Sequence, residues 1–188
     1  MSDSKSVLVL VGSLRAASVN RALAEALAAN APAGVAVSVY DGLGDLPFYN
    51  EDVDVAPGDG ELPAAVTKFR EAVGAADAVL IVTPEYNGTI PAVLKNAIDW
   101  GSRPYGAGAL AGTPTGVIGS AIGRFGGKWA KDDTRRSLGV AGAKVVEELS
   151  VELPAEVTTG TPVADVPGVI DLLRGAVEEL VAAEVVAA

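Results

Sequence analysis

Short runs of apolar residues alternate along the chain with segments whose apolar positions recur at helical spacing. The first run, Val7–Val11, is apolar throughout, which is typical of a central parallel strand buried on both faces. Because Gly12 and Ser13 break it, we interpret this run as a strand that ends in a turn. Similar runs predict four further strands, at 35–40, 78–83, 115–119 and near 144–149.

Helical periodicity predicts a helix in each interval between these strands and another at the end of the chain. Ser18 occupies a position suited to a helix N-cap, and Pro91 suits the first turn of its helix. The last helix presents one apolar face for packing. The predicted helices span about 18–30, 63–74, 91–100, 128–138 and 166–186.

Strands that alternate with helices predict an α/β fold, a doubly wound five-stranded parallel sheet with helices on both faces. The chain of 188 residues has the length of one domain, so we expect residues 1–188 to form a single domain. No apolar run approaches the eighteen or so residues that a bilayer span needs. We therefore expect a cytoplasmic protein with no membrane partner.

Composition removes several classes of function. The net charge of −10 argues against a nucleic-acid partner, which would need a basic face. The chain has no cysteine and no histidine, so a disulfide scaffold, a thiolate nucleophile, a Ser-His-Asp triad and the usual zinc sites are excluded. If the protein is an enzyme, a bound cofactor is expected to supply the reactive chemistry.

The first candidate loop, Gly12–Asn20, connects a strand to a helix N-terminus, where free N–H groups and the helix dipole favour an anion. Ser13 and Ser18 add hydroxyl donors, and Arg15 adds a positive charge. The loop lacks the glycines of a dinucleotide fingerprint and the Gly-Lys-Ser/Thr of a P-loop. It suits a single phosphate monoester, although an ordinary turn with a serine cap would have the same sequence.

Two further loops follow the third and fourth predicted strands. Thr83–Pro91 contains two prolines and a glycine, and such a rigid backbone could hold a flat heterocycle, with Glu85 either solvated or paired internally. Gly119–Gly127 has four glycines, which allow close approach to a ligand. Each loop alone could be a structural turn. Because the carboxyl ends of parallel strands share one sheet edge, we expect the three loops to converge there.

Two of these loops carry motifs that resemble the NADPH-dependent FMN reductase family, which includes chromate- and quinone-reducing flavoproteins. The resemblance covers roughly residues 6–150 and implies a flavodoxin-like fold, an FMN cofactor, and NADPH or NADH as reductant. The motifs are Gly12-Ser13-Leu14-Arg15-x-x-Ser18-x-Asn20 and Pro84-Glu85-Tyr86-Asn87-Gly88-x-x-Pro91-x-x-Leu94-Lys95-Asn96-Ala97-Ile98-Asp99-Trp100.

The resemblance also implies which residues hold the cofactor. The FMN phosphate would contact Ser13, Arg15, Ser18, Val19 and Asn20. The isoalloxazine ring would lie against Pro84, Glu85, Tyr86, Asn87 and Gly88, with Ser120 and Gly123 closing its far side. We expect no catalytic residue in the narrow sense, because the flavin performs the redox chemistry.

The activity implied is a ping-pong transfer of electrons from NAD(P)H to quinones or similar small acceptors, such as free flavin, chromate or azo compounds. A homodimer or homotetramer is implied as well. An FMN electron carrier that docks on protein partners is the alternative, and a scaffold that has lost its cofactor is a third hypothesis. The chain departs from the family at Trp129 and Lys131, where an arginine and a glutamine are usual, and Arg124 or Lys128 could substitute for that arginine.

Overall fold

The computed structural model describes residues 4–54, 60–123 and 125–186, so Arg124 lies outside the described residues. Its five strands form one sheet in the order β2-β1-β3-β4-β5, and every neighbouring pair is parallel. This order, in which the first strand is flanked by the second and third, is that of flavodoxin-like sheets. The strands are β1 (Lys5–Val11), β2 (Val35–Tyr40), β3 (Ala78–Val82), β4 (Pro114–Ile118) and β5 (Lys144–Val145).

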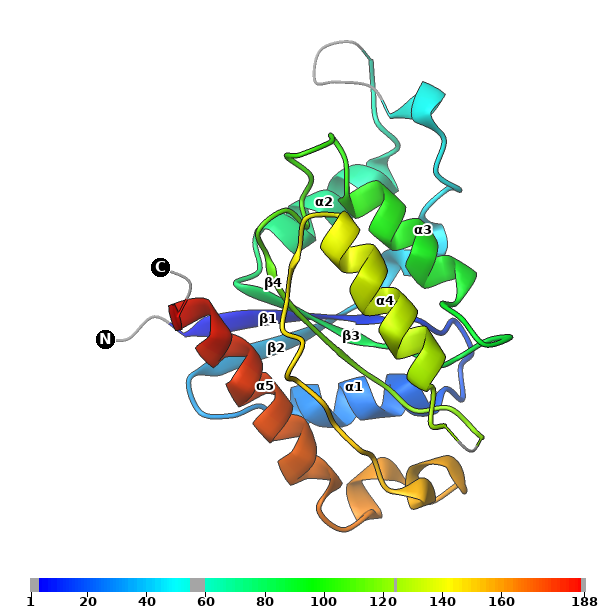
Figure 1. The fold of residues 1–188 in the computed structure, drawn as a ribbon, viewed down its shortest axis with the longest axis vertical. Helices are drawn as coiled ribbons and strands as arrows, with labels where there is room; N and C mark the ends of the chain where they lie inside the picture. The colour runs from blue at the N-terminus through cyan, green and yellow to red at the C-terminus, as the bar shows by residue number, and fades with distance from the viewer. Residues whose placement is uncertain (1–3, 55–59, 124, 187–188) are drawn as a thin grey trace.

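Helices cover both faces of the sheet, which confirms the predicted fold class (Figure 1). The first and last helices share one face, and the other three pack on the opposite face. Within the described residues, no helix is both long and apolar enough to cross a bilayer. The helices are α1 (Val19–Ala29), α2 (Ala64–Gly74), α3 (Ala92–Gly101), α4 (Lys128–Val140) and α5 (Val169–Val186).

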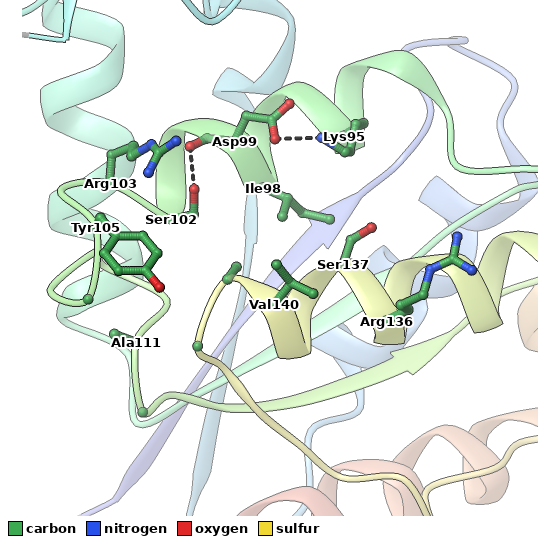
Figure 2. Close-up of a pocket in the computed structure, with 14 residues that line it drawn as sticks. Lys95, Ile98, Asp99, Ser102, Arg103, Tyr105, Ala111, Arg136, Ser137 and Val140 are labelled. Carbon is green, nitrogen blue, oxygen red and sulfur yellow. Dashed lines mark hydrogen bonds and ion pairs between the residues drawn. The ribbon is translucent and has the colours of Figure 1, made fainter. Parts of the chain in front are cut away.

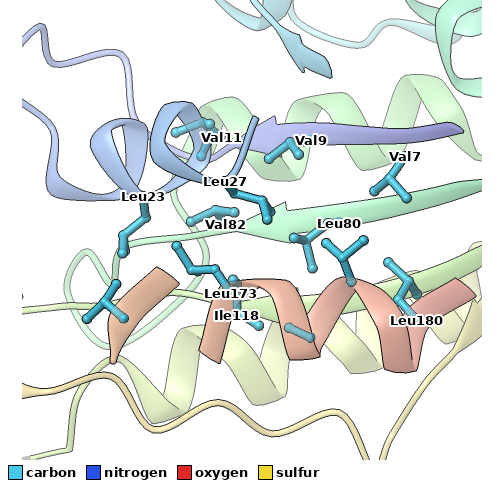
Figure 3. Close-up of a cluster of buried hydrophobic side chains, with 14 of the residues drawn as sticks. Val7, Val9, Val11, Leu23, Leu27, Leu80, Val82, Ile118, Leu173 and Leu180 are labelled. Atoms are coloured by element: carbon cyan, nitrogen blue, oxygen red, sulfur yellow. The ribbon is translucent and has the colours of Figure 1, made fainter. Parts of the chain in front are cut away.

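The alternation of side chains along β1 supplies both cores. Val7, Val9 and Val11 point toward α1 and α5, where they meet residues such as Leu27 and Leu173 (Figure 3). The intervening leucines of β1 belong to the second core, which is packed under α2, α3 and α4. The run Val7–Val11 is therefore buried on both faces, as its composition predicts.

The fifth strand is much shorter than predicted. It comprises Lys144–Val145 instead of 144–149. Past this point Arg135 of α4 donates hydrogen bonds to the carbonyl of Val117 in β4, at 3.0 Å, and to that of Leu149, at 3.1 Å. The guanidinium thus donates to carbonyl groups that would otherwise accept hydrogen bonds in a longer pairing of β4 with β5. This contact joins residues far apart in the chain, so no periodic pattern in the sequence indicates it.

Helix boundaries also differ from those expected. Pro91 is the N-cap of α3 and lies just before its first turn. The last helix begins at Val169 and not at 166, because Gly168 adopts a left-handed backbone with a φ of 77°. By contrast, α1 ends as predicted, and Ser18 is its N-cap.

Candidate cofactor site

The three loops that follow β1, β3 and β4 meet at one edge of the sheet. The N–H of Gly12 donates to the carbonyl of Val82 at 3.0 Å, and the N–H of Thr83 donates to the carbonyl of Ile118 at 3.0 Å. These hydrogen bonds place the carboxyl ends of β1, β3 and β4 side by side. A Cβ on Gly119 would lie 2.0 Å from the carbonyl oxygen of Thr83, so only glycine fits here. The predicted convergence is confirmed.

The first loop forms a compact turn on the N-terminus of α1. The hydroxyl of Ser18 accepts a hydrogen bond from the N–H of Arg21 at 3.3 Å, and the hydroxyls of Ser13 and Ser18 belong to buried residues. Arg15 is exposed. Because α1 begins at Val19, its first N–H groups lack intrahelical acceptors and, with the helix dipole, favour a negative charge at this place.

Asn20 connects the first loop to the third. Its side chain is 3% exposed, and its amide nitrogen donates to the carbonyl of Ser120 at 2.8 Å. The N–H of Ser120 in turn donates to the amide oxygen of Asn20 at 2.9 Å. Both polar atoms of this amide therefore hold the backbone of the third loop, a positioning role that the motif alone did not predict. Whether Asn20 also contacts a phosphate stays a prediction.

The second loop is a tight hairpin. Tyr86 and Thr89 exchange backbone hydrogen bonds of 3.2 and 3.1 Å around Asn87 and Gly88. Asn87 has a φ of 51° and Gly88 a φ of 77°, the pair of positive values that defines a type I′ turn. The dipeptide Asn-Gly is the usual sequence signal for this turn, and sequence reasoning missed it. The hydroxyl of Tyr86 lies 3.3 Å from that of Ser13, which joins the second loop to the first.

Two side chains fasten the second loop to α4. The carboxylate of Glu85 accepts a hydrogen bond from the N–H of Ala130 at 3.1 Å, in the first turn of α4. The hydroxyl of Thr89 donates to Asp133 at 2.7 Å. A carboxylate at a helix N-terminus is stabilised by the exposed N–H groups and the dipole. Of the two alternatives for Glu85, the structure therefore shows the internally paired one.

An aromatic pair borders this hairpin. Trp129 is 51% exposed and Phe125 52% exposed, and their ring centroids lie 5.3 Å apart at an interplanar angle of 42°. A Cβ on Gly88 would lie 3.4 Å from Cε3 of Trp129, so the indole is adjacent to the turn. In the same loop, Gly123 has a positive φ, and a Cβ built on it would meet nothing within 4 Å. The glycine-rich loop thus leaves open space at Gly123, whereas at Gly119 it is closely packed.

Lys131, the second departure from the family pattern, is half-buried on α4. Burial lowers the pKa of its ammonium group, and the nearby positive charge of Arg135 lowers that pKa further. Ser120, which sequence reasoning placed beside the ring, is buried at the base of the glycine-rich loop.

A groove of about 730 Å³ lies away from these loops, between the C-terminal halves of α3 and α4 (Figure 2). An ion pair of 2.5 Å between Lys95 and Asp99 borders it. Tyr105 and Val140 line it and are 88% and 84% exposed. Both helices begin at the loops and run away from them, so the groove is a separate feature, which sequence reasoning did not identify.

Comparison with known proteins gives a consistent result. A family profile described as NADPH-dependent FMN reductase matches residues 6–157. A quinone reductase of Pseudomonas putida is 50% identical over 139 residues, which are 73% of this chain and 72% of that protein. A 2-hydroxy-1,4-benzoquinone reductase of a Burkholderia species is 42% identical over 129 residues, 69% of this chain and 67% of that protein. Among solved structures, the flavoenzyme NAD(P)H:(acceptor) oxidoreductase FerB from Paracoccus denitrificans aligns with a TM-score of 0.77 and 32% identity, covering 95% of this chain and 96% of that one.

Proposed function

The chain belongs to the NADPH-dependent FMN reductase family, and from this membership we propose that it is an FMN-dependent NAD(P)H oxidoreductase that passes electrons to quinones or similar small acceptors. The balanced reaction is NAD(P)H plus a proton plus quinone, giving NAD(P)⁺ plus hydroquinone, so two electrons and two protons reach the quinone. The observation that carries the proposal is the closure of three strand-end loops on one edge of the sheet, through Ser13–Tyr86 and Asn20–Ser120.

The first loop fits a phosphate monoester. Ser13 and Ser18 supply hydroxyls from buried positions, and the first N–H groups of α1, at Val19 and Asn20, supply further donors. Arg15 adds a cation at the solvent side of the loop. A phosphate carries two negative charges near neutral pH, so this combination of dipole, donors and one arginine matches its chemistry.

The other two loops fit a flat ring. Pro84–Gly88 offers backbone groups on a rigid hairpin, while Ser120 and Gly123 belong to the glycine-rich loop, which has open space beside Gly123. When bound, FMN supplies the centre that accepts a hydride and later gives up two electrons. The protein orients this ring and leaves room for one reactant at a time, which is the physical basis of a ping-pong mechanism.

Quinones are the acceptors that the relatives support best, because the Pseudomonas and Burkholderia proteins are named as quinone reductases. Free flavin, chromate and azo compounds remain candidate acceptors.

We propose a cytoplasmic location, where NAD(P)H is available, and a single flavodoxin-like FMN-binding domain over residues 1–188. We also propose a homodimer or homotetramer; the exposed apolar residues of the α3–α4 groove support it. Light scattering that finds only monomer would refute it.

Anaerobic reduction tests the main proposal. The purified protein, loaded with FMN, is mixed with NADPH or NADH while the flavin absorbance is followed, and a quinone is then added. Rapid bleaching followed by reoxidation is the expected result. Protein-bound FMN that stays oxidised with both nucleotides would contradict a reductase and favour the electron carrier. A protein that cannot be loaded with FMN would favour the scaffold hypothesis.

A substitution tests the phosphate assignment. Arg15→Ala should weaken FMN binding about tenfold, or about 1.4 kcal/mol, while turnover at saturating FMN changes less. Arg174→Ala removes the same charge from the exposed surface of α5, away from the three loops, and serves as the control. Equal FMN dissociation constants for the two variants, measured by fluorescence titration, would exclude Arg15 from the phosphate site.

A further inference from the structure

Trp129 and Phe125 form an exposed aromatic surface at the N-terminus of α4. Each ring is about half exposed, and the two are tilted against each other at 5.3 Å. Large aromatic side chains usually bury most of their area, because transfer from water is favourable. A pair that remains half exposed beside a binding loop therefore has area available for a ligand.

The indole of Trp129 lies beside the second loop. It lies against Gly88 of the type I′ turn, where a Cβ would come within 3.4 Å of the ring. The neighbouring residue Ala130 donates its N–H to Glu85 of the same hairpin. The indole thus lies next to the segment that we propose for the isoalloxazine ring.

We propose that Trp129, supported by Phe125, determines acceptor selectivity by stacking on flat, fused-ring aromatic quinones. This inference rests on the proposed function, since it assumes that the acceptor reaches the flavin beside the hairpin. Stacking strength grows with the overlapping ring area, so a two-ring naphthoquinone gains more from an indole than a one-ring benzoquinone does.

The main experiment compares two acceptors. We use the FMN-loaded protein with NADPH and measure kcat/KM for 2-methyl-1,4-naphthoquinone and for 1,4-benzoquinone. Trp129→Ala should lower the ratio of these two constants about twofold to fivefold, because the ratio reports only the difference in stacking between the two acceptors and a whole stacked pair contributes at most about tenfold. Trp129→Phe should lower it less, because a smaller aromatic ring remains. Tyr105→Ala removes a more exposed aromatic ring, 88% exposed against 51% for Trp129, from the α3–α4 groove and should leave the ratio unchanged.

Fluorescence gives a readout that does not depend on turnover. The chain has two tryptophans, and Trp100 is fully buried whereas Trp129 is half exposed. Without NADPH, the naphthoquinone should quench the emission of the FMN-loaded wild type more strongly than the benzoquinone does at equal concentration. Trp129→Phe, which retains only Trp100, should lose that difference. This comparison also tests the proposal if Trp129→Ala does not fold.

The outcomes separate this proposal from the proposed function. An unchanged acceptor ratio in Trp129→Ala, with FMN still reduced by NADPH, overturns the role of Trp129 and leaves the reductase intact. A change confined to the KM for NADPH also overturns it, because the indole would then contact the nucleotide and not the acceptor. Failure of the wild type to be reduced contradicts the proposed function itself.

Discussion

Asn20→Ala is the substitution for which the structure predicts the clearest effect. The amide of Asn20 makes two hydrogen bonds with the backbone of Ser120, at 2.8 and 2.9 Å, and both residues are buried. Alanine removes both partners at once and leaves the N–H and the carbonyl of Ser120 without acceptor or donor, unless water enters.

The magnitude follows from these two groups. Each buried polar group left without a partner costs about 1–3 kcal/mol, so the pair costs about 2–6 kcal/mol. Alanine regains about 0.5 kcal/mol because it favours a helix more than asparagine does. The net loss of unfolding free energy is therefore about 1.5–5.5 kcal/mol, and for a chain of this size the melting temperature should fall by roughly 3–20 °C.

Urea unfolding followed by circular dichroism measures this loss, with Asn30→Ala as the matched control. Asn30 is the C-cap of the same helix and is exposed, and its side-chain amide donates a hydrogen bond to the carbonyl of Ala26 at 2.8 Å. The control should lose about 0.5 kcal/mol or less. Equal losses in the two variants would refute the reasoning, because the buried pair would then contribute no more than a surface contact.

Asn20→Asp sharpens the test. An ionised carboxylate can still accept from the N–H of Ser120, but it faces the carbonyl, so the pKa of the introduced carboxyl should be raised in the folded protein. Stability should therefore increase as the pH is lowered toward its ordinary pKa of about 4, where the protonated group can donate to that carbonyl. A variant whose stability shows the wild-type pH dependence would contradict this arrangement.

Three further substitutions test other contacts. Glu85→Ala should lower stability by about 1 kcal/mol, with Glu85→Gln intermediate, because it removes the acceptor of the Ala130 N–H in the first turn of α4. Thermal melts would refute this if both variants matched the wild type. Hydrogen bonds from the N–H and then the hydroxyl of Ser6 lower the pKa of Asp77. The contribution of Asp77 to stability is therefore present above the ordinary pKa of an aspartate and is lost as the pH falls through the lowered value. Asp77→Asn should remove that part of the acid dependence, as measured by urea unfolding at a series of pH values. Arg135→Lys should lower the free energy of unfolding by about 1–3 kcal/mol, because it gives up hydrogen bonds to two carbonyl groups. The control Arg136→Lys, at an exposed position, should lower it by less than about 0.5 kcal/mol. Equal losses in the two variants would show that the two carbonyl contacts contribute little to stability.

The features that follow from local pattern were predictable from the sequence. The run Val7–Val11, the Ser18 cap and the alternation of strands and helices each reflect forces between residues close in sequence, and they were sufficient to derive a parallel sheet with three converging loops. The short β5 was not predictable, because Arg135 competes for the same carbonyls from a different element. Strand propensity contains no information about such a competitor.

Within the site, the same distinction holds. The residue types of the first loop indicated an anion, because a helix N-terminus acts locally. The pairing of Asn20 with Ser120 joins residues 100 apart in sequence, and no spacing rule identifies it. Glu85 had two possible environments, and only the position of α4 decides between them. The Asn87-Gly88 turn is different, since its signal was present and was overlooked.

Because β5 is so short, the two edges of the sheet differ in how readily they can pair with a strand of another chain. At one edge only two residues form a strand, and the guanidinium of Arg135 already occupies the next carbonyls, so an incoming strand finds little backbone to pair with. At the other edge β2 presents six extended residues, bonded to β1 on one side only. Intermolecular strand pairing, and the aggregation that begins with it, should therefore start at β2, where a charged residue introduced on the outer face would be the natural protection.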